Sequence, residues 1–304
     1  MQIAGKTAEQ LMRPFGEHVA ATPANLAPEK QGELGALYGG PPWEILFSGG
    51  DANFVAVVEG NQETGGHQII ARYAGLLGLW STVQAVVAVT DAAVIALNAG
   101  RKTIPSDPAS IYGMAQRYVD YARMLVRDAN VPFPEHLESP DVSSAGGDAL
   151  RVNNLFYGAV GWILLHEIGH IHLKHQRIVT DDISKQQENE ADRFATDWIL
   201  SGSGIPQPHR EFRIFAVAAA MQWLGLVDQV RRGSTTHPHT SERLGRCRAI
   251  MSPNDDSPGL EPASYMLKAI FLPSIELPES EHAAFAFDEV LYAYSQAPRE
   301  VIVR

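Results

Sequence analysis

The sequence predicts an α+β protein with a mostly helical core and a small mixed or antiparallel sheet. Three short runs rich in β-branched and aromatic residues follow one another between residues 44 and 72, and glycine-containing turns separate them. Most of the chain after residue 72 carries helix signals, namely long apolar segments, stripes at helical spacing and capping residues. The sequence contains no internal repeat.

The first part of the chain is expected to hold the sheet. Residues 1–42 are rich in Ala, Gly and Pro and have weak periodicity, which predicts an irregular N-terminal leader with room for one short helix. Strands are expected at 44–47, 53–58 and 67–72. A helix over 76–98 should follow them and end at Asn-Ala-Gly.

Capping residues place the next helices. Asp107 and Pro108 predict a helix over 108–128, and Asp148 predicts a long helix over 149–174 after a loop at 129–147. Ser184 and Gln187 form a capping box that opens a helix ending near residue 200. Further helices are expected at 212–231, 241–251, 261–271 and 281–295. The segment 43–251 is therefore the predicted main domain, with 252–304 as a helical extension packed on it.

Composition and charge narrow the classes of function. The chain has 304 residues, of which 45% are hydrophobic and 19% charged, an ordinary balance for a globular protein. Its net charge is -11 and it has no run of Lys and Arg, which excludes nucleic acid as an expected partner and favours a protein or peptide substrate. Cys247 is the single cysteine, so no internal disulfide can form. The N-terminus lacks the pattern of a signal peptide, and a cytoplasmic location is expected.

Two uncharged apolar stretches raise the question of membrane insertion. Residues 73–90 reach roughly the length that spans a bilayer, whereas 214–227 are too few. The longer stretch contains Ser81, Thr82, Gln84 and several glycines. Both stretches are predicted to be buried core helices, without membrane insertion.

The strongest motif is His166-Glu167-Ile168-Gly169-His170, an HExxH pattern late in the predicted helix 149–174. A separation of four residues puts both imidazoles on one face of a helix, about one turn apart, so that they can bind one metal ion. Glu167 falls between them in angle, beside the open position of that metal. The motif predicts a zinc site in which Glu167 takes the proton of the attacking water.

Glu188, on the next predicted helix, is the expected third ligand, and two alternatives stand beside it. A histidine six residues after His170 would indicate the metzincin arrangement, but that position is Gln176. His175 lies five residues after His170 and is expected to point elsewhere. Glu188 and Glu190 cannot both face the metal; Glu188 is preferred because it shares a helix face with Asp192, which can hold a zinc-bound histidine. Three protein ligands and one water are typical of a catalytic zinc site.

The segments HEIGH and QENEADRFA resemble the HExxH plus ExxxD pattern of gluzincin peptidases, in particular the group that includes the CAAX prenyl proteases and HtpX-type membrane peptidases. This resemblance implies a zincin-like (minigluzincin) fold over 43–251, with Glu188 as metal ligand and Asp192 behind a ligand histidine. The segment containing His237 and Arg243 is similar to a downstream element of that group. His237 is then a candidate to stabilise the oxyanion or merely a loop cap, and Arg243 is expected to orient a carboxylate.

Two further likenesses refine this prediction. The run 53–56, followed by 69–77, resembles the hairpin of the same group, whose edge strand aligns the substrate. The chain lacks the hydrophobic spans of the membrane relatives. A chain of this length without such spans, carrying LLHEIGHIHLKH and ENEADRFATDWIL, is more similar to the Lit-type phage-exclusion peptidases. Those are cytosolic enzymes that cleave elongation factor Tu.

Three functions are compatible with these patterns. The first is a zinc-dependent endopeptidase that acts on a cytosolic protein, in phage exclusion or as a toxin-like enzyme. The second is an ImmA-like regulatory peptidase that cleaves a repressor, although no helix-turn-helix module is evident. The third is a zinc-bound interaction protein without turnover. Glu167 argues against the third, because a site that does not turn over has no need of a carboxylate that activates water.

Overall fold

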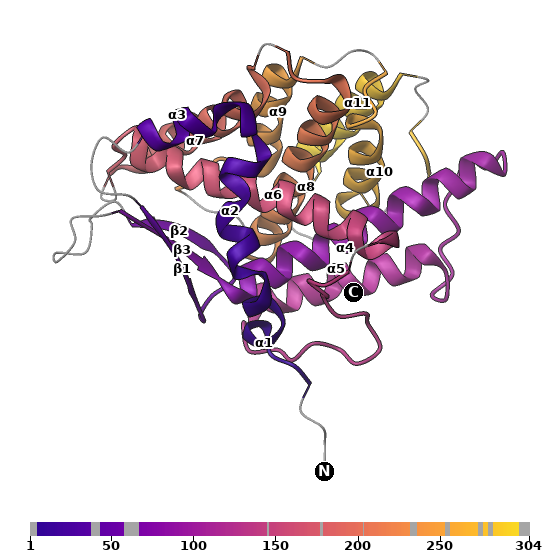
Figure 1. The fold of residues 1–304 in the computed structure, drawn as a ribbon. Helices are drawn as coiled ribbons and strands as arrows, with labels where there is room; N and C mark the ends of the chain where they lie inside the picture. The colour runs from indigo at the N-terminus through magenta and orange to yellow at the C-terminus, as the bar shows by residue number, and fades with distance from the viewer. Residues whose placement is uncertain are drawn as a thin grey trace.

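Helices make up most of this protein, and one small sheet lies against their flank (Figure 1). This arrangement confirms the predicted α+β class. The computed structural model describes residues 5–37, 43–57, 67–144, 146–176, 179–202, 204–231, 236–252, 256–272, 276–278 and 282–297.

The sheet contains three described strands, β1 (Glu44–Ser48), β2 (Phe54–Val57) and β3 (Gln68–Arg72), in the order β1-β3-β2. β3 runs parallel to β1 and antiparallel to β2, so the sheet is mixed. Among the described residues β2 has no strand on its outer side, and it packs there against helix α6. One edge of the sheet therefore meets the helix that carries the HExxH motif.

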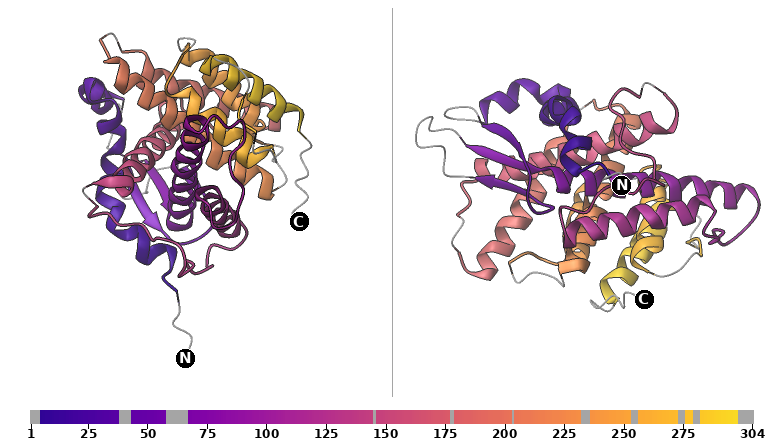
Figure 2. Two further views of the ribbon diagram at one scale, coloured as in Figure 1. Left: turned by 90° about the vertical axis from the view of Figure 1, so that its right-hand side faces the viewer. Right: turned by 90° about the horizontal axis from the view of Figure 1, so that it is seen from below.

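Three long helices form the centre of the core. α4 (Tyr73–Asn98) and α5 (Ile111–Arg127) lie side by side in both views of Figure 2. α6 (Gly147–His172) runs through the body and contacts α4. It also contacts three helices described below, α2 (Gly16–Leu26), α7 (Asp181–Leu200) and α8 (Gln207–Arg231). The largest fully buried side chains include Trp162 on α6 and Trp223 on α8. The HExxH motif is thus built on a helix that is held on several sides.

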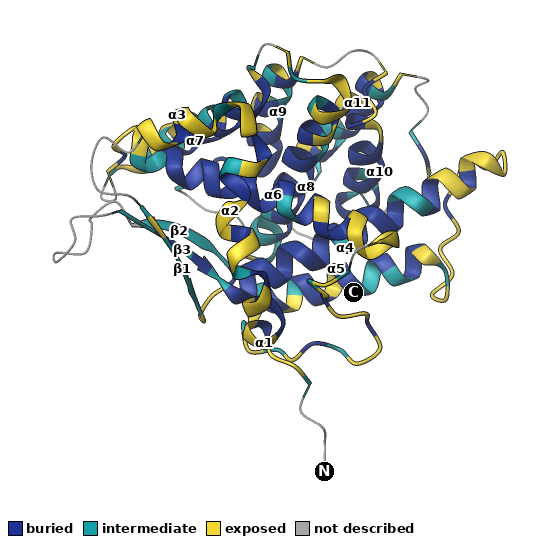
Figure 3. Cartoon of the chain, in the orientation of Figure 1, coloured by how far each residue is buried: buried dark blue, intermediate teal, exposed yellow. Residues whose placement is uncertain are grey.

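α4 is long and apolar enough to cross a membrane by length and composition. In the structure, 72% of its most apolar window is buried inside the protein, which agrees with the predicted core helix. Its last turns protrude and are exposed, with Ile95 53% accessible (Figure 3). The second uncharged stretch also lies in the core, where Ile214, Val217 and Met221 are fully buried.

The expectation of an irregular N-terminal leader is wrong for residues 8–36. This segment forms α1 (Ala8–Met12), α2 (Gly16–Leu26) and α3 (Gln31–Ala36), joined by two short 3-10 turns. Phe15 and Val19 are buried, and the ring of Phe15 meets Phe156 of α6 edge-to-face at 5.9 Å. Apolar side chains at helical spacing therefore outweigh the breaking tendency of the prolines and glycines.

Several of the predicted helix starts are displaced, and α4 begins at Tyr73, three residues before its predicted start. α5 begins three residues after the predicted position, because Ser110 is its N-cap and accepts a hydrogen bond from Gly113 N–H. Asp107 instead accepts from the N–H of Ala109 in the preceding turn. α6 begins at Gly147, so that Asp148 lies inside its first turn rather than at the cap. A carboxylate is also favourable there, since it faces the positive end of the helix dipole.

α7 (Asp181–Leu200) begins three residues before the capping box that was predicted to open it. Thr180 is the N-cap residue, and Ser184 N–H bonds the Thr180 carbonyl as part of the first helical turn. α8 (Gln207–Arg231) ends as predicted but begins five residues earlier than expected. The remaining helices lie within two residues of their predicted bounds: α9 (Thr240–Met251), α10 (Leu260–Phe271) and α11 (Ala283–Gln296). α10 packs on α4 and α8, and α11 packs on α10 and α9.

Candidate metal centre

Three potential metal ligands meet where α6 lies against α7. His166 and His170 occupy successive turns of α6, and their Nε2 atoms are 3.1 Å apart. Glu188 reaches them from α7, with Oε2 3.5 Å from Nε2 of His166 and Oε1 3.5 Å from Nε2 of His170. Among the described residues these side chains form the group of three potential donors within 4.8 Å of one another.

The donor set fits a metal ion in both spacing and chemistry. Two atoms bound to one zinc ion at 2.0–2.1 Å and a tetrahedral angle lie about 3.3 Å apart, close to the three separations between these donor atoms. Burial, together with the neighbouring His166, lowers the pKa of His170 to about 3, so its ring is neutral, the form that binds metals. Burial opposes ionisation of Glu188, but its contacts with His166, His237 and Arg243 hold its pKa well below the usual value.

A buried carboxylate lies behind the first histidine. Oδ1 of Asp192 is 2.9 Å from Nδ1 of His166, on the side of the ring away from Glu188. Asp192 is 1% exposed, and both of its oxygens accept hydrogen bonds from Arg243. Burial alone would raise the pKa of Asp192, yet Arg243 and His166 lower it. The carboxylate is therefore ionised and can hold His166 with Nδ1 protonated and Nε2 directed at the metal position.

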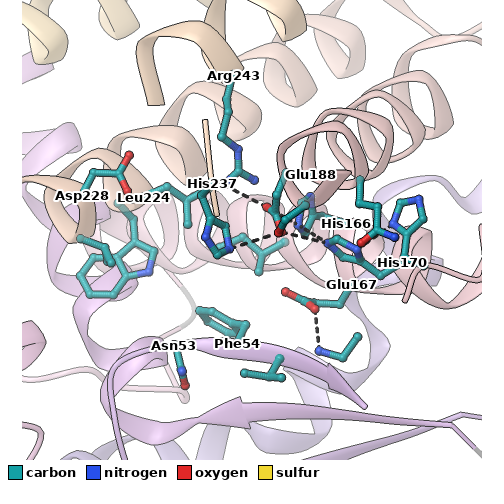
Figure 4. Close-up of a pocket in the computed structure, with 18 of the residues that line it drawn as sticks. Asn53, Phe54, His166, Glu167, His170, Glu188, Leu224, Asp228, His237 and Arg243 are labelled. Atoms are coloured by element: carbon teal, nitrogen blue, oxygen red, sulfur yellow. Dashed lines mark hydrogen bonds and ion pairs between the residues drawn. The ribbon is translucent and has the colours of Figure 1, made fainter. Parts of the chain in front are cut away.

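Glu167 connects the ligands to the sheet. Its Oε2 accepts a hydrogen bond of 2.6 Å from the backbone N–H of Ala56 on β2. Figure 4 shows its carboxylate between the ligand side chains and the strand. Burial raises the pKa of Glu167 above its ordinary value, which makes the carboxylate a stronger base. A proton acceptor thus stands beside the metal position at the edge of the sheet.

His175 lies outside the group of three donors, as expected, but it contacts one of them. Its Nδ1 lies 2.8 Å from Nδ1 of His170, and its Nε2 lies 3.1 Å from Oε2 of Glu190. The two alternatives to Glu188 therefore contact each other and sit behind the second histidine, outside the group of three donors.

A cleft of about 560 Å³ opens in front of these residues. Residues 52–56, α6, α7 and α8 line it together with His237 and Arg243. His237 faces Glu188 from the side opposite the two histidines (Figure 4), with Nε2 3.3 Å from Oε1 of Glu188. Its side chain is 46% exposed. The larger apolar side chains of the wall include Phe54, Trp162, Ile163, Trp223, Leu224 and Val227.

The structure brings together all the side chains that the sequence singled out for the site: His166, Glu167, His170, Glu188, Asp192, His237 and Arg243. Sequence reasoning missed the N–H of Ala56 and the contacts of His175 and Glu190. A backbone donor leaves no mark in the side-chain pattern. For His175, the available signal was one more histidine, three residues after the end of the motif helix.

Comparisons with known proteins place the chain among peptidases. The model of the family described as Peptidase U49 matches residues 69–263, which include both motif helices. The chain is also similar to the Cell death peptidase of Escherichia coli (strain K12), with 25% identity over 231 residues that cover 74% of this chain and 77% of the relative. No solved structure is significantly similar to it.

Proposed function

We propose that this protein, which belongs to the Peptidase U49 family and is a peptidase, is a zinc-dependent endopeptidase that hydrolyses a cytoplasmic protein. One observation carries the proposal. The donor atoms of His166, His170 and Glu188 are spaced for a single zinc ion, and the carboxylate of Glu167 stands between them and a strand edge. Those are the parts that metal-assisted hydrolysis of a peptide bond requires.

Zinc bound by these three side chains would supply a Lewis acid that polarises the substrate carbonyl and makes water more acidic. Glu167 takes the proton from the attacking water and later delivers it to the leaving amine. Its raised pKa favours the first transfer, and the bond from Ala56 N–H holds the carboxylate in place between the two transfers. Asp192, fixed by Arg243, keeps His166 oriented throughout.

The substrate is proposed to lie extended along β2. The cleft follows this strand from Ala52 to Ala56, and among the described residues no other strand pairs with its outer side. Main-chain hydrogen bonds to such an edge bind a peptide whatever its side chains are, and the wall of the cleft then selects among them. A bound segment would pass over Glu167 and beneath His237, which is our candidate for stabilising the oxyanion.

A role in phage exclusion is proposed, with elongation factor Tu as the favoured substrate. Two observations support it: the likeness of the motif helices to Lit-type peptidases and the similarity to the cell death peptidase over most of the chain. A peptidase active on abundant cytoplasmic proteins must be restrained, so a narrow substrate range or a required activator is expected.

Mass-spectrometric mapping of new N-termini tests this proposal. Cells would produce the wild-type protein or Glu167→Gln, with and without phage challenge. One dominant cut in elongation factor Tu, seen with the wild type alone, is the expected result. A dominant cut in a repressor would favour the regulatory peptidase instead. Broad cleavage of unfolded proteins would indicate quality control, and identical N-termini under all conditions would contradict the proposed activity.

A further inference from the structure

The two ligand histidines are supported by different kinds of partner. His166 has a buried carboxylate at its Nδ1, whereas Nδ1 of His170 faces another histidine, His175, at 2.8 Å. His175 is itself buried, and its Nε2 lies 3.1 Å from Glu190 on α7. Glu190 in turn accepts a hydrogen bond from Gln186 at 2.8 Å. A chain of three polar groups thus runs from His170 to a carboxylate at the surface.

Metal binding would fix which atom donates and which accepts in both hydrogen bonds that link His170, His175 and Glu190. When Nε2 of His170 binds the metal, the ring proton is on Nδ1, and this N–H donates a hydrogen bond. Nδ1 of His175 must then be the acceptor, which leaves the proton of that neutral ring on Nε2. That N–H points at Oε2 of Glu190, a carboxylate oxygen that accepts it. Both hydrogen bonds therefore suit one tautomer of each ring.

The backbone is shaped to bring His175 back to the site. α6 ends at His172, and Lys174 then adopts the left-handed conformation with φ 57°. A residue other than glycine rarely adopts this conformation, because its Cβ crowds the carbonyl oxygen. The turn returns the N–H of His175 to the carbonyl of His170 at 3.0 Å, which sets its ring against the ring of His170.

We propose that His175 and Glu190 are positioning residues for the metal: Glu190 acts through His175 to orient His170 and to strengthen it as a ligand. This inference rests on the proposed metal site. Carboxylate–histidine pairs behind a metal ligand fix its tautomer and raise its basicity. Here a second imidazole extends that arrangement by one ring.

The test measures zinc affinity by competition with a chelator, and it needs no substrate. His175→Leu should weaken zinc binding about 10 to 100-fold, the usual effect of losing such a partner. His175→Asn places an amide oxygen near the position of Nδ1 and should recover part of that loss. Glu190→Gln should weaken binding less than His175→Leu. His172→Ala is the matched control, since His172 lies on the same helix end, is exposed and packs its ring against Phe194 instead.

The double variant separates a relay from simple packing. If Glu190 acts through His175, Glu190→Gln should have no further effect in the His175→Leu background. The visible spectrum of the cobalt-substituted protein should also change in His175→Leu and return toward the wild type in His175→Asn. The inference alone would be overturned if the two substitutions lowered zinc affinity additively. It would also be overturned if His175→Leu bound zinc as tightly as a wild type that holds one zinc. A wild type that binds no zinc would overturn the proposed function as well.

Discussion

Arg243 donates two hydrogen bonds to Asp192, from Nε and Nη2, each 2.7 Å long, with both side chains buried. Nη1 of Arg243 is also 3.4 Å from Oε2 of Glu188. One guanidinium from α9 therefore joins the carboxylate behind His166 to the carboxylate ligand, and its positive charge offsets two buried negative charges. The candidate metal site therefore depends on a residue that lies outside the group of three potential ligands.

Replacing Arg243 by Met should destabilise the protein strongly. The change leaves the Asp192 carboxylate buried without its cation, and breaking a buried ion pair from one side costs about 3–5 kcal/mol. Chemical denaturation of the metal-free protein measures this loss. Arg248→Met is the matched control on the same helix, because the pair of Arg248 with Asp288 is more exposed and should contribute about 1 kcal/mol or less. Equal decreases in the free energy of unfolding in the two variants would show that the buried Arg243–Asp192 pair contributes no more than the exposed pair.

Metal binding should release a proton from His166. Burial alone would lower the pKa of this histidine. Asp192 and Glu188 outweigh that effect and raise the pKa of His166 to about 10 in the metal-free protein. His166 is then protonated at pH 7, and the metal must displace that proton, so affinity rises as pH rises toward the pKa. Calorimetry of zinc binding in two buffers of different ionisation enthalpy should report about one proton released. A heat independent of the buffer would contradict this protonation state.

His237→Ala should lower turnover with little change in the Michaelis constant. The ring lies at the open side of the cleft, and contacts to an oxyanion form mainly in the transition state. Steady-state kinetics on a cleaved substrate separate the two parameters. If the Michaelis constant rises while turnover is unchanged, His237 binds the substrate and does not stabilise the oxyanion.

Ala56→Pro should impair cleavage while zinc remains bound. Proline removes the N–H that holds Glu167, and it is tolerated at the free edge of a sheet. Val55→Pro is the informative comparison. Successive N–H groups of a strand point to opposite edges, so the N–H of Val55 faces β3 and its loss should lower stability. Zinc content and thermal unfolding of both variants test this. Joint loss of zinc and stability in Ala56→Pro would mean that β2 is purely structural at this position.

The cluster of three potential metal ligands could be predicted from sequence because helix geometry brings its members together. His166 and His170 are one turn apart in any helix, and Glu188 and Asp192 share a face of the next helix by the same rule. Their observed contacts with one another follow once α7 folds back along α6. The main helices were predictable for a different reason. Their long apolar stretches must be buried, and helices bury them in the core.

What could not be predicted depends on the path of the backbone. The contact of Ala56 with Glu167 joins residues 111 positions apart and uses a main-chain donor that any residue but proline supplies. The place of His175 depends on a left-handed Lys174, for which the sequence gives no glycine as a signal. The N-terminal helices were missed because Pro23 suggests a break, whereas it lies within α2.

The central claim is that the three donors hold a catalytic zinc ion and that Glu167 moves the proton. Zinc content and peptidase activity, measured together on purified wild type and Glu167→Gln, test it most directly. The account predicts one zinc per chain in both proteins and cleavage by the wild type alone, because glutamine fills the space but cannot accept the proton. Cleavage by Glu167→Gln at the wild-type rate, or by wild-type protein stripped of metal, would contradict it.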